Sequence, residues 1–505
     1  MKPTIPLRLL APFVVASLLG AQDAPPAPTG EAPEEAEVVK GVLRHESGAD
    51  DGYTLIAPLG ATETFLIDMQ GEIVHAWGSE LAPSGPAYLL DNGNLLRPGR
   101  LDDNPRFRGG GIGGRIEEYD WDGFLVWEYQ LMDDGRTQHH DLAVLPNGNV
   151  LAIVWRHHDA EEVRAAGRDP RVVVDKGMWA CAVVEIRPER PDGGEIVWEW
   201  DSWDHLIQDL DSELANYGSI PENPGRIDIN ADHRDRPPMT EAERKKLEEL
   251  ERQMAALGYA GGDEEEDEED GQRLERGKNP DWLHMNSVNH HPELELLALS
   301  TPTLNEIWVI DHSTSREEAR GSSGGRWGRG GDLLYRWGNP RNYGAGGDAE
   351  RRLFYQHDPQ WLPDEGDGLK LTLYNNGRGR PEGDYSTAIV LELPFDPERG
   401  FLREEGAAFG PEAPAWSWGS EGTLFSPFIS GTQRLTNGNT LICEGANGRL
   451  VEVTAAGDVV WEYVNEHAGE PAPPTEIAPP TKGGALFRAT RIPADAAALE
   501  GREFD

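Results

Sequence analysis

Apolar and polar residues alternate in short runs along most of this chain, and the runs come in pairs. In each pair the first run ends in a turn that contains Gly, and the second ends in Trp or Tyr. One clear copy extends from Phe65 through Gly71 to Trp77. Alternation with a period of two predicts strands with one packed face, so each copy predicts an antiparallel hairpin. Five clear copies and one degenerate copy occupy residues 65–77, 116–129, 184–200, 307–337, 450–463 and 388–418.

A further strand pair precedes several of these hairpins, and it is often marked by Asn-Gly, as at residues 92–93, 147–148 and 437–438. Asn-Gly supplies the positive φ that a type I′ hairpin turn requires. Two hairpins make a four-stranded blade, and repeats of about 40–50 residues are typical of propellers. The six aromatic-terminated hairpins therefore predict an all-β, six-bladed β-propeller. Because the Trp and Tyr residues recur at one place in the repeat, we expect them to pack between blades.

Residues 202–280 interrupt the junction between the third and fourth blades. A helix is predicted from Met239 to Leu257, with Thr240 as its cap. Residues 263–270 are consecutive acids, which repel one another and favour a solvated, disordered segment. Calcium binding is the alternative, but this run lacks the alternating ligands and the glycine of a calcium loop. We therefore interpret residues 202–280 as an inserted helical and acidic segment.

The N-terminus has the pattern of a secretory signal. Lys2 and Arg8 precede an apolar run over residues 9–19, and the small residues Gly20 and Ala21 follow. A membrane anchor would need roughly 18–20 uninterrupted apolar residues, and Pro12 lies inside this shorter run. The sequence predicts a signal peptide at 1–21, a flexible spacer at 22–42, a propeller at 43–492 and a C-terminal tail at 493–505. It predicts a periplasmic or secreted protein with no membrane span.

The charge composition of the chain limits which macromolecules it can bind. The chain has 46 Lys and Arg against 90 Asp and Glu, a formal net charge of −44 at pH 7. This acidity disfavours nucleic acid as a partner, which would need a basic face. The two cysteines, Cys181 and Cys443, lie in apolar strand-like runs with no spacing signature. They could pair in an oxidising compartment, but we expect two buried free thiols.

Three histidines occur at the same phase of the repeat. His140, His284 and His357 each open the strand that begins a new blade. The innermost strands of a propeller line its central channel, so these side chains are expected to converge there. Convergent polar groups in a pocket are the usual first hypothesis for a site. Such histidines suit metal binding or nucleophilic group transfer, and spacing alone does not separate the two.

Several segments carry unusual motifs in a fixed order, among them Gln356-His357-Asp358. These segments are residues 281–288, 306–311, 334–340, 356–358, 375–381 and 425–431. They resemble the bacterial arylsulfotransferase (aryl-sulfate sulfotransferase) family over most of residues 52–492, apart from the insertion. The resemblance implies a periplasmic six-bladed propeller that moves a sulfuryl group from a phenolic sulfate ester to a phenol. It implies no nucleotide sulfate donor, no cofactor and no metal, with phenolic sulfates and phenols as small-molecule partners.

The resemblance also implies roles for individual residues. The family's sulfohistidine falls in the Gln-His-Asp segment, so His357 is the candidate nucleophile. His140, and His284 with Asn286, would surround the sulfuryl oxygens, and His140 would exchange a proton with the phenolic oxygen. Charge on the non-bridging oxygens would be stabilised electrostatically, as in phosphoryl transfer. A covalent intermediate predicts ping-pong kinetics.

One position departs from the family pattern. The family often has an arginine in a Ser-x-Arg stretch that contacts the sulfate, whereas this chain has Pro302 at that place, within residues 300–303. Loss of a guanidinium from a desolvated anion site costs on the order of several kcal/mol. Arg378 and Arg380, the candidate substrate-binding arginines, or Arg156 would have to compensate.

Two other functions remain open from the sequence. The first is a non-catalytic propeller that binds a sulfated or anionic ligand, or a protein, through the histidines and the insertion. The second is a quinone-cofactor propeller, because residues 194–200 also resemble the blade motif of quinoprotein dehydrogenases. Those proteins usually have more blades and a calcium site, for which this chain shows no set of ligands.

Overall fold

The computed structural model describes residues 39–504 except 102–103, 105, 235, 260–274, 276, 364–365, 367 and 472–483. The proposed signal peptide and the acidic run at 263–270 therefore lie outside the described residues. Among the helices of the described segments, none is both long and apolar enough to cross a membrane.

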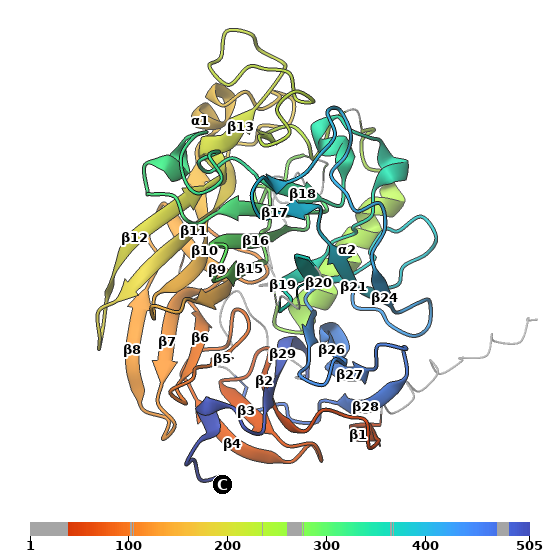
Figure 1. Ribbon diagram of the computed structural model, residues 1–505. Coiled ribbons are helices and arrows are strands. Elements are labelled where there is room, and N and C mark those ends of the chain that lie inside the picture. The colour runs from red at the N-terminus through yellow and green to blue at the C-terminus, as the bar shows by residue number, and fades with distance from the viewer. Residues whose placement is uncertain are drawn as a thin grey trace, which may run out of the picture. The chain divides into compact units, whose positions relative to one another are not determined.

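Six antiparallel sheets follow one another around a central axis (Figure 1). The first strands of successive sheets contact one another from β9 through β15, β19 and β25 to β29. The first three sheets are β29 (Leu486–Pro493), β2 (Gly52–Pro58), β3 (Glu63–Ile67) and β4 (Ile73–Gly78); β5 (Tyr88–Leu89), β6 (Leu95–Arg100), β7 (Gly114–Tyr119) and β8 (Leu125–Gln130); and β9 (Arg136–Val144), β10 (Val150–His158), β11 (Met178–Pro188) and β12 (Gly194–Asp201).

The next three sheets follow the same order from the inside outward. They are β15 (Ser287–His291), β16 (Leu296–Thr301), β17 (Glu306–Asp311) and β18 (Tyr335–Trp337); β19 (His357–Trp361), β20 (Lys370–Asn375), β21 (Thr387–Glu392) and β24 (Trp416–Trp418); and β25 (Gly431–Arg434), β26 (Thr440–Glu444), β27 (Arg449–Val453) and β28 (Val459–Val464). The six-bladed β-propeller expected from the sequence is confirmed.

Both ends of the chain close the ring. The C-terminal strand β29 pairs with β2 and becomes the innermost strand of the first blade. The N-terminal strand β1 (Gly41–His45) pairs with β28 and adds a fifth, outermost strand to the last blade. Strand pairing between residues more than 400 positions apart therefore joins the first blade to the last.

The outer-strand tryptophans tie each blade to the next. The fourth strand of each blade contains a tryptophan whose indole N–H donates to a carbonyl of the next blade, in the turn between its outer strands. These fourth strands are β4, β8, β12, β18, β24 and β28. The six bonds are Trp77 to Asp120, Trp127 to Gly193, Trp200 to Gly331, Trp337 to Pro411, Trp418 to Gly457 and Trp461 to Met69, at 2.7–3.1 Å. The last bond closes the circle. This arrangement confirms that these aromatics pack between blades.

The insertion contains the predicted helix. Helix α2 (Glu241–Ala256) begins after Thr240, whose hydroxyl accepts from the Glu243 N–H while the Glu243 carboxylate accepts from the Thr240 N–H. Shorter elements complete the described chain: α1 (Ala160–Ala165), β13 (Leu206–Ile207), β14 (Ile227–Asp228), β22 (Phe395–Asp396), β23 (Gly400–Phe401), and the 3-10 turns η1 (Ser202–His205), η2 (Glu318–Arg320), η3 (Pro340–Tyr343), η4 (Asp348–Glu350), η5 (Gly445–Asn447) and η6 (Ala497–Leu499).

Helix α2 packs against the propeller. Leu250 is buried in a cluster that contains Phe428 and Phe487, and Met254 and Leu257 pack against the same cluster. An ion pair between Lys246 and Asp384 joins the helix to the loop before β21. Because burial of apolar surface stabilises this contact, the insertion is attached to the face of the ring where Phe428 and Phe487 lie.

The two cysteines do not pair with each other. Cys181 lies in β11 and Cys443 in β26, and both are buried free thiols. Burial raises the pKa of both thiols above the ordinary range, so they stay protonated at neutral pH. The expectation of two buried free thiols is confirmed.

Candidate active site

The three histidines singled out from the sequence lie on, or just before, innermost strands, at places where the backbone is unusual. His140 in β9 and His284 just before β15 have φ values of 56° and 48°, and Asp358, next to His357 in β19, has 59°. Non-glycine residues rarely adopt this region, and such strain concentrates at functional sites. The pairing of β9 and of β19 also shifts register here. Bulges of this kind re-aim side chains.

The backbone distortions bring the imidazoles together. The rings of His140 and His284 meet edge to face, with centroids 4.5 Å apart. The ring of Phe487, from β29, lies 6.0 Å from that of His140 and 6.3 Å from that of His357. Three histidines from three blades thus gather beside one phenylalanine from a fourth. We call His140, His284 and His357 the histidine centre.

His357 has one nitrogen held and one unpartnered. Its Nδ1 lies 2.8 Å from the Asn376 Oδ1 and 3.2 Å from the Tyr355 carbonyl oxygen, so it donates its proton there. The Nε2 atom is buried and has no hydrogen-bond partner among the described residues. Burial lowers the pKa of His357 to about 3. At neutral pH the ring is therefore uncharged, with a lone pair on Nε2.

His140 is connected on both sides. Its Nε2 lies 2.7 Å from the hydroxyl oxygen of Tyr259, and its Nδ1 lies 2.6 Å from Nδ1 of His139. Burial and the neighbouring histidines lower the pKa of His140, whereas burial raises that of Tyr259. The phenol therefore donates to Nε2, and the His140 N–H donates to His139. Nε2 of His139 in turn lies 3.8 Å from the Cys181 sulfur.

His284 is oriented by a carboxylate. Its Nδ1 is hydrogen-bonded to Oδ2 of Asp281, three residues earlier in the chain. The other oxygen of Asp281 accepts from the indole N–H of Trp155 at 3.0 Å. An imidazole held at Nδ1 by a fixed carboxylate keeps a defined ring orientation. This leaves Nε2 as the nitrogen of His284 that can face a substrate.

Asn286 holds the backbone that leads into His357. Its Nδ2 donates to the carbonyl of Gln356 at 3.0 Å, and its Oδ1 accepts from the Ser287 hydroxyl at 3.0 Å. The Ser300 hydroxyl donates to the same Gln356 carbonyl at 3.0 Å. In this structure Asn286 therefore positions the nucleophile candidate through its main chain.

Arg378 lies near the turn that carries Pro302. Its guanidinium stacks on the Tyr355 ring at 3.2 Å, and the Tyr355 N–H donates to Asn305, whose own N–H donates to the Pro302 carbonyl. The charge of Arg378 also acts on the phenol of Tyr259. Arg378 has no hydrogen bond or ion pair to the described part of the chain.

The other two arginines are engaged elsewhere. Arg380 stacks on Phe354 and Tyr385, and none of its described contacts reaches the histidine centre. Arg156 forms ion pairs with Glu199 and Asp201 of β12. Of the three arginines named from the sequence, only Arg378 thus contacts a residue that bonds to the centre: it stacks on Tyr355, whose carbonyl accepts from His357.

A buried arginine joins the strands beneath the histidines. Nη2 of Arg488 lies 2.8 Å from Asp141, and Nη1 lies 3.0 Å from Asp358; these aspartates directly follow His140 and His357. The two carboxylates also accept from groups on other innermost strands. These groups are the hydroxyl of Tyr88, the N–H of Val288 and the N–H of Thr432. All six innermost strands therefore meet in one polar layer.

A sequence model of the family described as Arylsulfotransferase (ASST) matches residues 60–390. This chain belongs to the arylsulfotransferase family. The matched region contains all three histidines of the centre, Asn376 and Arg378. No curated protein matches the chain.

The chain is also similar to solved structures at low identity. One is a protein of unknown function from Bacteroides caccae, with 12% identity and a TM-score of 0.40, covering 87% of this chain and 98% of that one. Another is the periplasmic gluconolactonase PpgL of Pseudomonas aeruginosa, with 13% identity and a TM-score of 0.33, covering 86% of this chain and 99% of that one.

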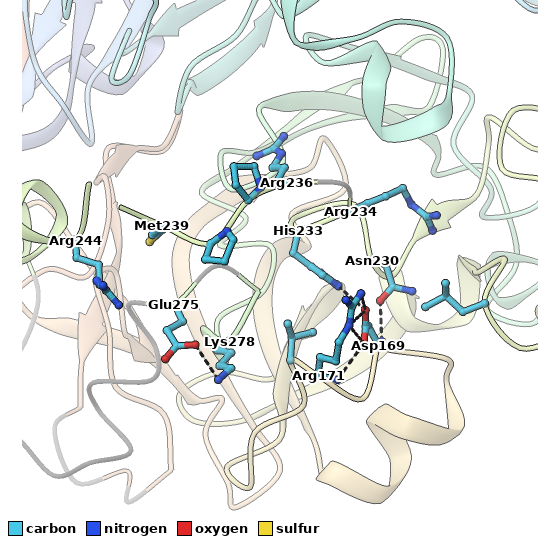
Figure 2. Close-up of a pocket in the computed structure, with 14 residues that line it drawn as sticks. Asp169, Arg171, Asn230, His233, Arg234, Arg236, Met239, Arg244, Glu275 and Lys278 are labelled. Atoms are coloured by element: carbon cyan, nitrogen blue, oxygen red, sulfur yellow. Dashed lines mark hydrogen bonds and ion pairs between the residues drawn. The ribbon is translucent and has the colours of Figure 1, made fainter. Parts of the chain in front are cut away.

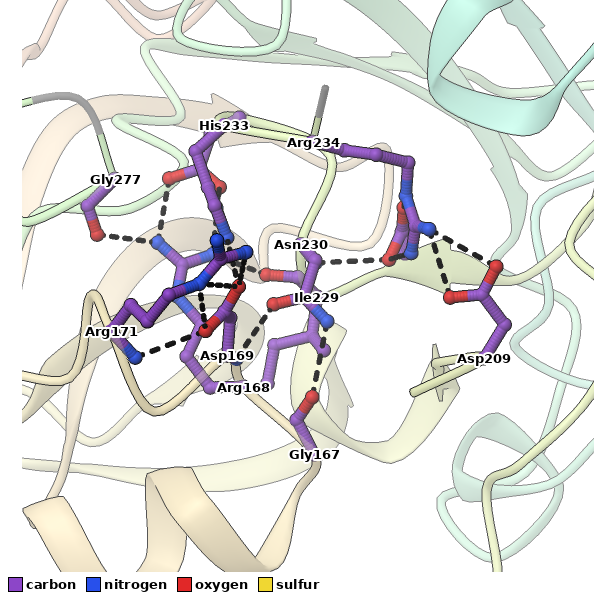
Figure 3. Close-up of polar contacts among 12 residues, drawn as sticks. Gly167, Arg168, Asp169, Arg171, Asp209, Ile229, Asn230, His233, Arg234 and Gly277 are labelled. Carbon is purple, nitrogen blue, oxygen red and sulfur yellow. Dashed lines mark hydrogen bonds and ion pairs between the residues drawn. The ribbon is translucent and has the colours of Figure 1, made fainter. Parts of the chain in front are cut away.

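This arylsulfotransferase family member also has a cavity of about 550 Å³, lined by the insertion and by residues 169–172 of blade three (Figure 2). Basic side chains line it, but several already have carboxylate partners: Arg171 binds Asp169, and Arg234 binds Asp228 and Asp209 (Figure 3). None of the three histidines lines this cavity. We therefore place the candidate active site at the histidine centre.

Sequence reasoning missed several residues that the fold brings to the centre. Tyr259 comes from the insertion and Phe487 and Arg488 from the closing strand, so no local pattern linked them to the histidines. Asp281 and Asn376 lie within the family motifs at 281–288 and 375–381. Their spacing was visible, but their pairing with His284 and His357 needed the tertiary structure.

Proposed function

We propose that this protein transfers a sulfuryl group from a phenolic sulfate ester to a phenol, with His357 as the covalent nucleophile. The observation that carries the proposal is the buried, unpartnered Nε2 of a His357 ring whose other nitrogen is fixed by Asn376. An activated nucleophile needs its lone pair aimed at the substrate and its far side oriented. Family membership supplies the reaction class.

In the first step, the Nε2 lone pair of His357 attacks the sulfur of the donor. A nitrogen–sulfur bond forms, the bond from sulfur to the aryl oxygen breaks, and the aryl oxide leaves with that electron pair. The sulfated ring carries a positive charge, which its Nδ1–H shares with the neutral Asn376 oxygen 2.8 Å away. Asn376 therefore stabilises the intermediate as well as the free imidazole.

In the second step, the oxygen of an acceptor phenol attacks the same sulfur and the nitrogen–sulfur bond breaks, which restores neutral His357. The phenolic proton passes to Nε2 of His140, because the lowered pKa of His140 leaves this ring unprotonated before the step. His140 then returns the proton to solvent or to the next aryl oxide. The two steps predict ping-pong kinetics.

We assign the positive charge that faces the sulfuryl oxygens to an arginine other than the family's usual one. Arg378 lies on Tyr355, next to the turn of Pro302, and we propose that it replaces the missing guanidinium. Arg488 also influences the pKa of His357, but its guanidinium is paired with Asp141 and Asp358. Charge fixed in a water-poor site stabilises the sulfuryl oxygens more than the same charge would in water.

Tyr259 occupies the place that we assign to the acceptor. Its phenolic hydroxyl lies on Nε2 of His140 at 2.7 Å, which is the contact that an acceptor phenol needs. Substrate binding therefore requires the Tyr259 side chain to move. Helix α2, which ends three residues before Tyr259, would move with it or release it.

Incubation of the protein with a chromogenic aryl sulfate and a phenol tests the proposal. We expect sulfated acceptor from the wild type, none from His357→Ala, and wild-type rates from His45→Ala, an exposed histidine of β1. Equal turnover by His357→Ala would overturn the nucleophile. A folded wild type that binds aryl sulfates without transfer would favour the alternative of a binding propeller, which the resident Tyr259 and Pro302 also suit.

A further inference from the structure

A second group of histidines lies at the other end of blade four. His284 comes just before β15, whereas His290 is near the end of that strand. Glu295 follows in the turn to β16, and His312 comes directly after β17. The antiparallel pairing of β15, β16 and β17 brings these three residues to one edge of the sheet. They are thus separated from the histidine centre by the length of β15.

The three side chains point at one another. The Glu295 Oε2 lies 3.3 Å from Nε2 of His290 and 3.2 Å from Nδ1 of His312, and the three atoms all lie within 4.8 Å of one another. N–H···O bonds are most often about 2.9–3.0 Å long. Ligands bound to a tetrahedral zinc ion at about 2.1 Å are separated by about 3.4 Å. The two observed separations, 3.3 and 3.2 Å, are close to that spacing.

A second carboxylate holds His312 from behind. Nε2 of His312 lies 3.0 Å from Oε2 of Glu185, a residue of β11 in the neighbouring blade. Glu185 is itself fixed by the amide of Asn149. The other ring nitrogen of His312, Nδ1, faces the Glu295 carboxylate at 3.2 Å. A carboxylate behind a ligating imidazole is typical of metal sites.

The backbone geometry at Glu295 fixes the position of this residue. Glu295 has a φ of 52°, a strained value for this residue, and its carbonyl accepts from the His312 N–H at 2.8 Å. The side chain of Glu295 is 44% exposed, whereas that of His312 is 7% exposed. The site is therefore walled by two imidazoles and opens to solvent on the glutamate side, where a metal ion and a water ligand could enter.

We propose that His290, Glu295 and His312 bind one divalent transition-metal ion of the zinc type, with water in the fourth position. Two imidazoles and one carboxylate suit zinc and its neighbours in the first transition row, whereas calcium and magnesium prefer oxygen ligands. Through Glu185 the ion would connect blade four to blade three. The site is independent of the sulfuryl-transfer proposal.

The test uses the full chain, stripped with EDTA and titrated with Zn²⁺. We expect one equivalent bound per chain and a higher Tm with Zn²⁺, while Ca²⁺ has neither effect. His312→Ala and Glu295→Gln should abolish that equivalent; Glu295 is partly exposed, so its variant should fold even if the other does not. Glu185→Gln, which keeps all three ligands, should weaken binding about 10–100-fold.

Two histidine variants serve as controls. His45→Ala and His284→Ala should both keep the bound equivalent, because His45 is on β1 and His284 belongs to the histidine centre. Absence of tight Zn²⁺ binding to the wild type would overturn the proposal. So would an equivalent that survives in both His312→Ala and Glu295→Gln, or one that disappears in His284→Ala, which would place the ion at the histidine centre.

Discussion

Nδ1 of His357 donates to Oδ1 of Asn376 across 2.8 Å, and the amide of Asn376 has no freedom to turn. Its Nδ2 donates to the carbonyls of Ser426 at 2.8 Å and Ile429 at 2.9 Å. These two bonds oblige the amide oxygen to face the imidazole. The tautomer of His357, and hence the position of its lone pair, is therefore set by main-chain atoms of the loop before β25.

Asn376→Ala should lower turnover without removing the nucleophile. The ring of His357 loses the acceptor that fixes its tautomer, so we expect kcat to fall roughly 10–100-fold, as for other orienting partners of histidine, with a small change in the donor KM. Steady-state kinetics and the ¹⁵N shifts of the His357 ring measure the two effects. Asn375→Ala is the matched control, because within the described residues the Asn375 side chain bonds to the main chain of Phe354 and Arg352 and not to His357. An equal loss of kcat in both variants would show that Asn376 acts only by stabilising the fold.

Tyr259→Phe should favour binding of the acceptor. The variant removes the hydroxyl that occupies Nε2 of His140, so an external phenol no longer competes with it. One hydrogen bond contributes about 1 ± 0.5 kcal/mol, so we expect the acceptor KM to fall up to roughly 10-fold with kcat little changed. Acceptor saturation curves measure this effect.

Tyr335→Phe provides the comparison for Tyr259→Phe. Tyr335 is also buried and donates one hydrogen bond, to the carbonyl of Gly410, but it lies between blades four and five. Its variant should leave the acceptor KM unchanged. A loss of transferase activity in Tyr259→Phe alone would instead make the tyrosine hydroxyl part of the catalytic machinery.

Acid should destabilise the fold through His357. The unfolded chain takes up a proton at this residue near pH 6.5, whereas burial lowers the pKa in the folded state to about 3. The unfolded state therefore binds more protons in this window, and the free energy of unfolding falls as pH decreases through it. For one such proton, the free energy of unfolding changes by about 1.4 kcal/mol per pH unit within this window.

Urea unfolding of the wild type and of His357→Gln between pH 7.5 and 4 isolates this contribution. The variant has no group that titrates at position 357, so its stability should depend less steeply on pH below 6.5. The comparison is needed because burial raises the pKa of Asp201 to about 6, which acts in the opposite direction. Parallel pH profiles for the two proteins would contradict a neutral, buried His357.

Local pattern was sufficient to predict the blades. Alternation and Asn-Gly turns report which residues pair with their immediate neighbours, and a capping residue such as Thr240 marks the start of a helix. Closure of the ring was not predicted, because β1 and β29 pair with strands from the other end of the chain. The aromatic positions were predicted, but not that each indole donates to the next blade, since that depends on how neighbouring turns approach each other.

The histidine centre was predicted for the same reason as the blades: equivalent places in a repeat converge on the axis. Residues outside the repeat were not accessible to this argument. Tyr259 reaches His140 only because α2 packs against Phe428 and Phe487. Arg380 shows the converse limit, because it shares a motif with Arg378 yet stacks on Phe354 and Tyr385. The spacing of two residues is visible in the sequence, whereas the direction in which each side chain points is set by tertiary packing.

Arg488 should be among the most sensitive positions for stability. Burial opposes its charge, but Asp141 and Asp358 raise its pKa above the ordinary value, so the guanidinium stays charged. Arg488→Met leaves two buried carboxylates without a counter-charge, at a cost of about 3–5 kcal/mol. The urea midpoint should fall accordingly. Arg187→Met, which removes an exposed pair with Glu195, should change it by less than about 1 kcal/mol.

A second substitution separates charge from packing at Arg488. If the loss arises from uncompensated carboxylates, adding Asp358→Asn to Arg488→Met should recover part of the stability, because one buried negative charge disappears. If it arises from the missing side-chain volume, the double variant should be no more stable than the single one. Arg488→Lys should fall between the two, since one ammonium group cannot reproduce the fork that reaches both Asp141 and Asp358.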